Sequence, residues 1–160
     1  MARAEGTASD AVAKERDRRR RLMGVCAEAT EAELEAALAS LGELPAAQEL
    51  RVPETGLVMV RGRIGGTGKP FNLGELSVTR AAVRLANGRT GIAYLIGRSP
   101  RRARLAALLD ALGQDPGYRA RLDANLIAPV LARVAEQDRA LRAAVAATKV
   151  DFFTLVRGEG

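Results

Sequence analysis

The sequence has no histidine and no tryptophan, and its only cysteine is Cys26. Without histidine there can be no Ser-His-Asp or Cys-His nucleophile system, no imidazole acid or base near neutral pH and no histidine-ligated zinc. One cysteine excludes an internal disulfide, an all-cysteine zinc site and a cysteine-ligated iron–sulfur cluster. We therefore expect neither a cofactor nor a metal on this chain.

Aromatic residues are also scarce, at 3% of the chain against 48% hydrophobic residues, so an aliphatic core is expected. No hydrophobic run approaches the roughly 18 residues of a membrane span. The N-terminal segment is charged and lacks the apolar stretch of a secretory signal, and its four acidic residues disfavour a transit peptide. The 160 residues are expected to form a single domain in the cytoplasm, without a membrane span.

What is abundant is arginine, and its distribution along the chain is uneven. The formal net charge of the whole chain is +6, but residues 25–56 carry −6 and residues 57–104 carry +9, with ten basic groups facing only Glu75. Residues 1–24 carry +3, and residues 105–160 are neutral. A concentrated excess of one sign favours a partner of the opposite sign, whereas a codon bias toward arginine would leave only solvated faces. Both interpretations stay open.

Hydrophobic periodicity predicts a helix-rich α+β fold in one domain, residues 1–160, with a small antiparallel sheet of three to four strands. The expected parts are a helical hairpin at 1–42, antiparallel strands at 48–97, helices at 99–148 and a β-favouring tail at 150–158.

Local signals predict where these elements begin and end. Thr30 and Glu33 form a capping-box pattern, and Ser99-Pro100, Asp115-Pro116 and Pro129 each indicate a helix start. The helix that starts at Asp115 is expected to end near residue 126.

In the strand region, residues 53–56 (Pro-Glu-Thr-Gly) predict a turn that separates strands at 49–52 and 57–64. Asn87-Gly88 predicts a hairpin between strands at 76–85 and 89–96, although residues 79–85 are also compatible with a helix.

A glycine-rich stretch at residues 61–71 resembles a nucleotide-binding loop in composition, but the spacing of its glycines does not match either of the two common nucleotide-binding motifs. A P-loop requires a glycine where Arg63 stands and a serine or threonine where Pro70 stands, and a dinucleotide fingerprint requires a glycine at Phe71. Two interpretations remain: a hairpin turn that needs positive φ, or a loop that contacts an anion or a partner. The candidate anion- or partner-binding residues are Arg61, Arg63, Gly65, Gly66, Thr67, Gly68, Lys69, Arg80 and Arg84.

Other chemically suggestive residues are interpreted as structural. The run Arg18–Arg21 is expected to be a solvated helix face, and Cys26 a small core residue. The tail is expected to form a terminal strand that pairs within this chain or with another chain. Its interface candidates are Phe152, Phe153, Leu155, Val156 and Arg157.

Four blocks of the sequence, at residues 54–61, 65–68, 76–85 and 149–158, closely resemble the PhnG family, the smallest subunit of the bacterial carbon–phosphorus lyase core complex. Blocks in the same order cover residues 20–158, and the terminal Val-Asp-Phe-Phe-Thr block is specific. A departure is Leu22, where an aromatic residue is expected, and this bears only on local packing.

The resemblance implies a hetero-oligomer with three larger subunits, H, I and J, the I subunit being the closest. In that family the I subunit, supported by G, H and an accessory L protein, replaces the adenine of ATP by an alkylphosphonate. The products are α-D-ribose 1-alkylphosphonate 5-triphosphate and adenine, and the J subunit's iron–sulfur chemistry later breaks the carbon–phosphorus bond. The resemblance implies that the cluster and any metal belong to partner subunits, and it assigns no catalytic residue to this chain.

The alternative function is a basic nucleic-acid-binding module. The high pI supports it, but the chain has few aromatic residues for base stacking and no recognised motif. A stand-alone phosphonate or nucleotide transferase would need activity from the isolated chain.

Overall fold

The computed structural model describes the backbone of residues 2–148 and the side chains of residues 10–148. In chain order the elements are α1 (Ala2–Glu28), α2 (Glu31–Ser40), β1 (Ala47–Arg63), β2 (Pro70–Leu85), β3 (Thr90–Ile96), α3 (Pro100–Gly113), α4 (Pro116–Leu122), the π-helical turn η1 (Asp123–Ile127) and α5 (Ala128–Ala147). The predicted α+β class is confirmed. The interface strand predicted at 150–158 lies outside the described residues.

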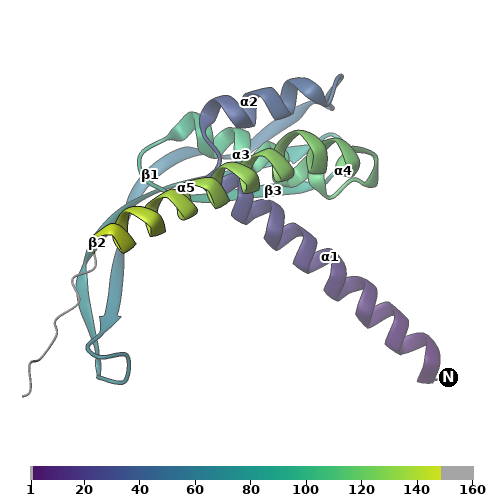
Figure 1. The fold of residues 1–160 in the computed structure, drawn as a ribbon. Coiled ribbons are helices and arrows are strands. Elements are labelled where there is room, and N and C mark those ends of the chain that lie inside the picture. Colours follow the sequence, from purple (N-terminus) through teal and green to yellow (C-terminus); the bar gives the residue numbers. More distant parts are fainter. Residues whose placement is uncertain (1, 149–160) are drawn as a thin grey trace, which may run out of the picture.

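The sheet has three antiparallel strands in the order β1-β2-β3. One of its faces is covered by helices, because side chains at alternate positions of a strand point the same way and the apolar set on that side packs against α3 (Figure 1). On β2 this buried set is Thr79, Ala81, Val83 and Leu85. Residues 79–85 are therefore strand, and the helical alternative is wrong.

The turn predicted at residues 53–56 is wrong, because β1 runs through it without interruption. The segments expected to be two strands are one strand of 17 residues, which leaves three strands in the sheet. Proline and glycine are tolerated here because β1 is an edge strand and its register with β2 shifts between Arg51 and Glu54. A bulge in an edge strand takes up the missing N–H of Pro53 without ending the strand.

Helix α3 packs closely against strand β3 at Gly91. A Cβ on Gly91 would come within 2.0 Å of the Ala107 carbonyl oxygen and 2.5 Å of the Ala111 nitrogen. Only a residue without a side chain allows this close approach of helix and strand. The aliphatic core lies on this side of the sheet, among α1, α2, α3, α4 and the start of α5.

Helices α1 and α2 both pack against α3. The predicted capping box of α2 is confirmed, since the Thr30 hydroxyl accepts from the Glu33 N–H and the Glu33 carboxylate accepts from the Thr30 N–H. Ser99 precedes α3 as predicted, but its side chain makes no capping bond, and its N–H donates instead to the Thr79 hydroxyl at 3.2 Å. Asp115 caps α4 as predicted.

Helix α4 continues into α5 through η1, so the break predicted between residues 126 and 129 does not occur. The N–H of Ala128 bonds to the carbonyl of Asp123, five residues earlier. Pro129 has no N–H to donate, and a widened turn next to a proline accommodates it within a continuous helical path.

Three elements project from this body: the N-terminal part of α1, the outer part of the β1–β2 hairpin, and α5 (Figure 1). Within residues 2–148, every helix is too short or too polar to cross a membrane.

Candidate functional site

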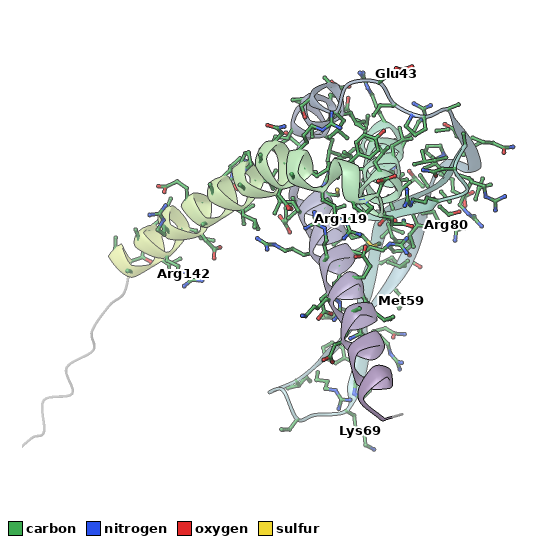
Figure 2. All side chains as sticks on the ribbon, turned by 90° about the vertical axis from the view of Figure 1, so that its right-hand side faces the viewer. Glu43, Met59, Lys69, Arg80, Arg119 and Arg142 are labelled. Atoms are coloured by element: carbon green, nitrogen blue, oxygen red, sulfur yellow. The ribbon has the colours of Figure 1, made fainter. Side chains whose placement is uncertain are left out.

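The outer part of the β1–β2 hairpin is a two-stranded arm. Strand β3 pairs with β2 only from Val78 to Arg84, whereas β1 pairs with β2 out to Arg63 and Pro70. We call residues 57–77 the arm. Its cations and its glycine loop therefore stand away from the helical body, with Lys69 at the far end (Figure 2).

The glycine loop at the end of the arm is a hairpin turn. Gly65 and Gly66 have φ of 62° and 77°, the left-handed region that glycine adopts without strain. The Gly68 N–H donates to the Ile64 carbonyl at 3.0 Å, and Arg63 Nη1 donates to the Gly68 carbonyl at 3.2 Å. The turn thus uses its own polar groups to close, and anion binding by this loop stays a prediction.

The nine candidate residues fall into two separate groups. Those from Arg61 to Lys69 lie at the end of the arm, whereas Arg80 and Arg84 lie where β2 crosses the body (Figure 2). From Pro70 to Arg84 the strand extends roughly 45 Å at about 3.3 Å per residue. One small anion cannot contact both groups.

Much of the positive charge of residues 57–104 is balanced inside the molecule. Arg80 Nε donates to Glu54 at 2.7 Å, and Arg104 Nε donates to Glu49 at 2.6 Å. Arg101 pairs with Glu31 and Glu35 of α2, and Arg89 pairs with Asp115. Two arginines hold the pKa of the Glu54 carboxyl below its usual value, first through the hydrogen bond from Arg51 and then through that from Arg80. The acidic segment 25–56 thus neutralises part of the basic segment.

Six cations of the basic segment have no carboxylate partner among residues 10–148. Arg63 and Arg102 donate to backbone carbonyls, and Arg98 donates to the Ser77 hydroxyl at 3.3 Å. The six are Arg61, Arg63, Lys69, Arg84, Arg98 and Arg102. Three of these six charges therefore lie at the end of the arm, and the other three lie on β2 (Arg84), just after β3 (Arg98) and on α3 (Arg102).

The second face of the sheet carries apolar side chains that no described helix covers. On β3 these are Ile92, Tyr94 and Ile96, which are 47%, 55% and 70% exposed. They lie opposite Ala82, Arg80 and Val78 of β2, so all six share one face. We call this surface the open face.

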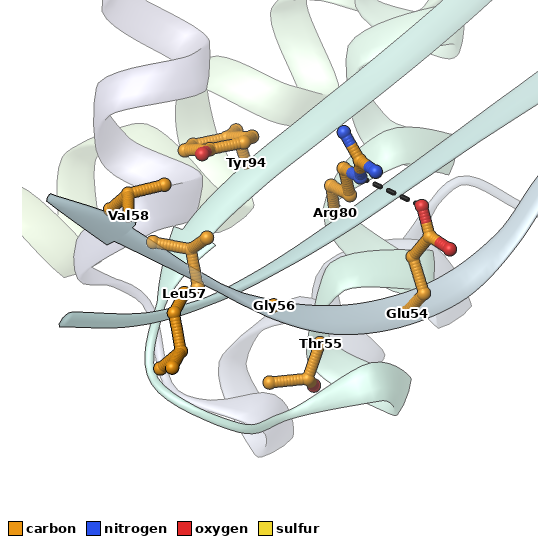
Figure 3. Close-up of a pocket in the computed structure, with 8 residues that line it drawn as sticks. Glu54, Thr55, Gly56, Leu57, Val58, Arg80 and Tyr94 are labelled. Carbon is orange, nitrogen blue, oxygen red and sulfur yellow. Dashed lines mark hydrogen bonds and ion pairs between the residues drawn. The ribbon is translucent and has the colours of Figure 1, made fainter. Parts of the chain in front are cut away.

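A hollow of about 230 Å³ lies in the open face, at the place where Gly56 of β1 pairs with Val78 of β2 (Figure 3). It exists because Gly56, opposite Val78, has no side chain, and a Cβ placed there would have no atom within 4 Å. Val58 and Tyr94 line the hollow together with the ion pair Arg80–Glu54. The only charged side chains that line the hollow, Arg80 and Glu54, are paired with each other, so the hollow offers no free cation to a polyphosphate.

Sequence reasoning did not identify the open face. The available signal was β3 itself, where Ile92, Tyr94 and Ile96 alternate with Ala93 and Leu95, so that both faces of the strand are apolar. An antiparallel strand that is apolar on both sides needs cover on both sides, and the helices of this chain supply it on one.

No cluster of three or more potential metal ligands occurs within the part of the chain that the structure describes. Cys26 is in the core, as predicted, and burial raises the pKa of its thiol to about 12. A neutral, buried thiol is neither a nucleophile nor a metal ligand at physiological pH.

The sequence matches a protein-family model and a curated relative. Residues 17–158 match the family model described as "Phosphonate metabolism protein PhnG". A protein of Rhizobium meliloti (strain 1021), the alpha-D-ribose 1-methylphosphonate 5-triphosphate synthase subunit PhnG, is 51% identical over 141 residues. That match covers 88% of this chain and 90% of the relative.

Proposed function

The chain belongs to the PhnG family of phosphonate metabolism proteins, and from this premise we propose that it is a subunit of an α-D-ribose 1-methylphosphonate 5-triphosphate synthase. The observation that carries the proposal is the 51% identity to the Rhizobium meliloti subunit, which extends over nearly all of both chains. The reaction proposed for the assembly joins an alkylphosphonate to the anomeric carbon of the ribose of ATP and releases adenine.

We propose a supporting role for this chain within the enzyme. The chemistry of its described residues agrees with that role: its only thiol is buried with a raised pKa, and most of its buried side chains are aliphatic. The catalytic groups, and any iron–sulfur cluster or metal, would then be contributed by other subunits of the assembly, which we propose to be H, I and J. ATP is a cytoplasmic nucleotide, and we propose that the assembly acts in the cytoplasm.

The arm supports a role for this chain in contacting something negative. Arg61, Arg63 and Lys69 are exposed at its end without a carboxylate partner among residues 10–148. We propose that this end faces either an acidic surface of the I subunit or the triphosphate of the substrate held there. The internal pairing of Arg80, Arg101 and Arg104 leaves less free charge for a generic nucleic acid than the sequence alone indicates.

Affinity purification tests the proposal. The full-length chain with an affinity tag is expressed in cells that grow on methylphosphonate as their phosphorus source, and the proteins that accompany it are identified by mass spectrometry. We expect the H, I and J subunits, and we expect the purified assembly to release adenine from ATP only when methylphosphonate is present. A well-behaved monomer that never accompanies the I subunit would overturn the proposal.

A further inference from the structure

Resting on the proposed function, we propose that the arm inserts into a groove of a different subunit of the assembly. One wall of that groove would be apolar, and carboxylates would lie where the end of the arm reaches. The end of the arm would then contact an acidic protein surface and not the triphosphate.

The arm has no cover within the part of the chain that the structure describes. Strand β3 stops pairing with β2 at Val78, and no described helix runs along the hairpin beyond that point (Figure 1 and Figure 2). A two-stranded hairpin is at best marginally stable in water unless it packs against something else. The arm therefore needs a partner surface.

One side of the arm is apolar along its whole length. Side chains at alternate positions of a strand share a side, and so do residues that pair across two antiparallel strands. Farther out on this side, the Leu73 side chain lies over Gly62, within 2.7 Å of the position that a Cβ would take there. The other members of this side are Val58, Val60 and Gly62 of β1, opposite Leu76, Gly74 and Phe71 of β2. This side carries no charged residue, so it fits apolar protein side chains and not a polyphosphate or a nucleic acid.

The other side of the arm changes character toward its end. Leu57 and Met59 lie nearer the body, and they are 59% and 51% exposed. Arg61 and Arg63 follow on the same side, and Lys69 lies in the turn at the end of the arm (Figure 2). These three cations have no carboxylate partner among residues 10–148. Enclosing them without carboxylates would cost free energy, so charge complementarity requires an acidic partner surface at this end.

This chain does not offer such a surface itself. Most carboxylates of residues 10–148 already form ion pairs. The carboxylates outside these pairs are scattered over α1, the loop between α2 and β1, and the arm, and they are Asp10, Glu28, Glu43 and Glu75. Residues 149–160 contain two basic and two acidic residues and are neutral overall. Neither a second copy nor the tail therefore supplies a cluster of carboxylates, and a different polypeptide is the occupant.

The first test removes apolar contact without changing charge. Leu73 and Leu76 are 62% and 42% exposed, so the double variant Leu73→Gln, Leu76→Gln should fold normally, which thermal unfolding confirms. We expect at least about a 10-fold drop in the partner subunit recovered with the tagged full-length chain. The drop should be the same at about 0.1 M and about 0.5 M salt, because no charge is altered. Val12→Gln with Val52→Gln is the matched control at 70% and 69% exposed residues outside the arm, and it should retain the partner.

The second test measures hydrogen exchange of the backbone amides of residues 57–77. A groove that encloses both sides of the arm excludes water from it. We expect these amides to exchange at least about 10-fold more slowly in the purified wild-type assembly than in the isolated full-length chain at low concentration.

Several outcomes would overturn the insertion of the arm while the proposed function stands. They are equal recovery of the partner by the Leu73, Leu76 variant and wild type, an equal loss for the control, or equal exchange of the arm in the assembly and in the isolated chain. Protection of the arm by tripolyphosphate alone would assign its end to the substrate. Protection that requires a dimer of this chain in light scattering would assign the arm to a second copy, and protection of the isolated chain that is lost on removal of residues 149–160 would assign it to the tail. If the wild-type chain recovers no synthase subunit, the proposed function fails and this inference falls with it.

Discussion

At the scale of single residues, one buried carboxylate joins three elements of the body. Asp110 of α3, 1% exposed, accepts from Nε and Nη2 of Arg19 on α1, each at 2.8 Å, and from the N–H of Ile92 on β3 at 2.9 Å. Arg18 of α1 likewise reaches Asp123 at 3.1 Å. The solvated helix face predicted for Arg18–Arg21 is therefore wrong for these two arginines. Because β3 is an edge strand, the N–H of Ile92 has no neighbouring strand to bond to, and Asp110 accepts its hydrogen bond instead.

We predict that Asp110→Ala destabilises the fold by about 2–4 kcal/mol. Removing one partner of a buried pair leaves the Ile92 N–H without an acceptor and Arg19 without its counter-ion. Because Arg19 is 37% exposed, water can hydrate it again once its partner is removed, so the expected loss in the free energy of unfolding is toward the low end of what breaking a buried ion pair costs. Urea unfolding followed by circular dichroism measures the loss. Asp138→Ala, in an exposed pair within α5, is the control and should change stability by less than about 0.5 kcal/mol. Equal effects would contradict the role given to Asp110.

We also predict that Cys26 is unreactive in the native protein. Burial raises the pKa of its thiol to about 12, and the thiolate is the reactive form. At pH 8 a thiol reagent such as Ellman's reagent should label the folded chain at least about 100-fold more slowly than the chain in guanidinium. Comparable rates in the two states would show that the thiol is accessible.

At the scale of elements, the N-terminus of α2 is held by a capping box and an ion pair at the same residue. Glu33 accepts from the Thr30 N–H at 2.7 Å and from Nε of Arg133 on α5 at 2.7 Å. The hydrogen bond from Arg133 is the main cause that lowers the pKa of the Glu33 carboxyl to about 2. One carboxylate thus ties the start of α2 to the root of α5.

The pKa of Glu33 predicts a pH dependence of stability. Because the pKa in the folded chain lies below the usual 4.5, folding favours the deprotonated form. The stabilisation is fully present above about pH 4.5 and is lost as the pH falls toward 2. We expect Glu33→Gln to cost about 1–2 kcal/mol at pH 6, less than an unscreened shift of this size implies, because the side chain is 27% exposed. The difference from wild type should shrink steadily between pH 4.5 and 2 in thermal melts. Glu43→Gln, which changes an exposed glutamate, is the control, and its stability relative to wild type should not vary with pH in this range. A stability difference between Glu33→Gln and wild type that stayed the same from pH 6 to pH 2 would contradict the prediction.

Strand glycines provide a second prediction at this scale. Gly91→Ala should destabilise the fold by about 3 kcal/mol, because its Cβ would meet backbone atoms of α3 and neither element can move alone. Gly56→Ala, where a Cβ meets nothing within 4 Å, should be neutral or stabilising by up to about 1 kcal/mol. The unfolding midpoints of the two variants in urea provide the comparison. A similar loss for both would show that α3 does not depend on close contact at Gly91.

At the scale of the whole molecule, the body is small and the projections are long. Exposed apolar side chains occur on the open face, on the arm and on α5, where Leu141 and Val145 are 63% and 61% exposed. Such an arrangement is typical of a subunit that completes its packing in an assembly, and we expect the isolated chain to be poorly soluble or to self-associate.

The charge at the end of the arm gives a prediction for the assembled protein. Reversing Arg61, Arg63 and Lys69 to glutamate together should change the unfolding temperature little, because none of them pairs with a carboxylate of the described residues and the one hydrogen bond lost, from Arg63 to the Gly68 carbonyl, is exposed. It should weaken recovery of the partner subunits by at least about 10-fold at low salt, and the difference should narrow at 0.5 M salt, where charges are screened within a few ångströms. Reversal of Arg20 and Arg21 on α1 is the control. Unchanged recovery and unchanged synthase activity would show that the arm contacts neither an acidic partner nor the triphosphate.

The sequence by itself determined where most elements begin. Patterns that act over a few residues, such as the capping box at Thr30, the cap at Asp115 and the turn at Asn87-Gly88, depend on hydrogen bonds and backbone angles set by those residues alone. The same is true of the glycine loop, whose positive φ values follow from its glycines. Absent residue types excluded whole classes of chemistry before any fold was known.

Tertiary structure decided what depends on distant residues. Whether Pro53 ends a strand depended on β1 being an edge strand, and whether the arginines of residues 57–104 were free depended on glutamates that precede them in the chain. The same dependence separated Lys69 from Arg84 by the length of a strand and left Tyr94 on a face without helices. Local preferences are fixed by neighbours in sequence, whereas charge balance and surface exposure are sums over neighbours in space, which only the folded chain defines.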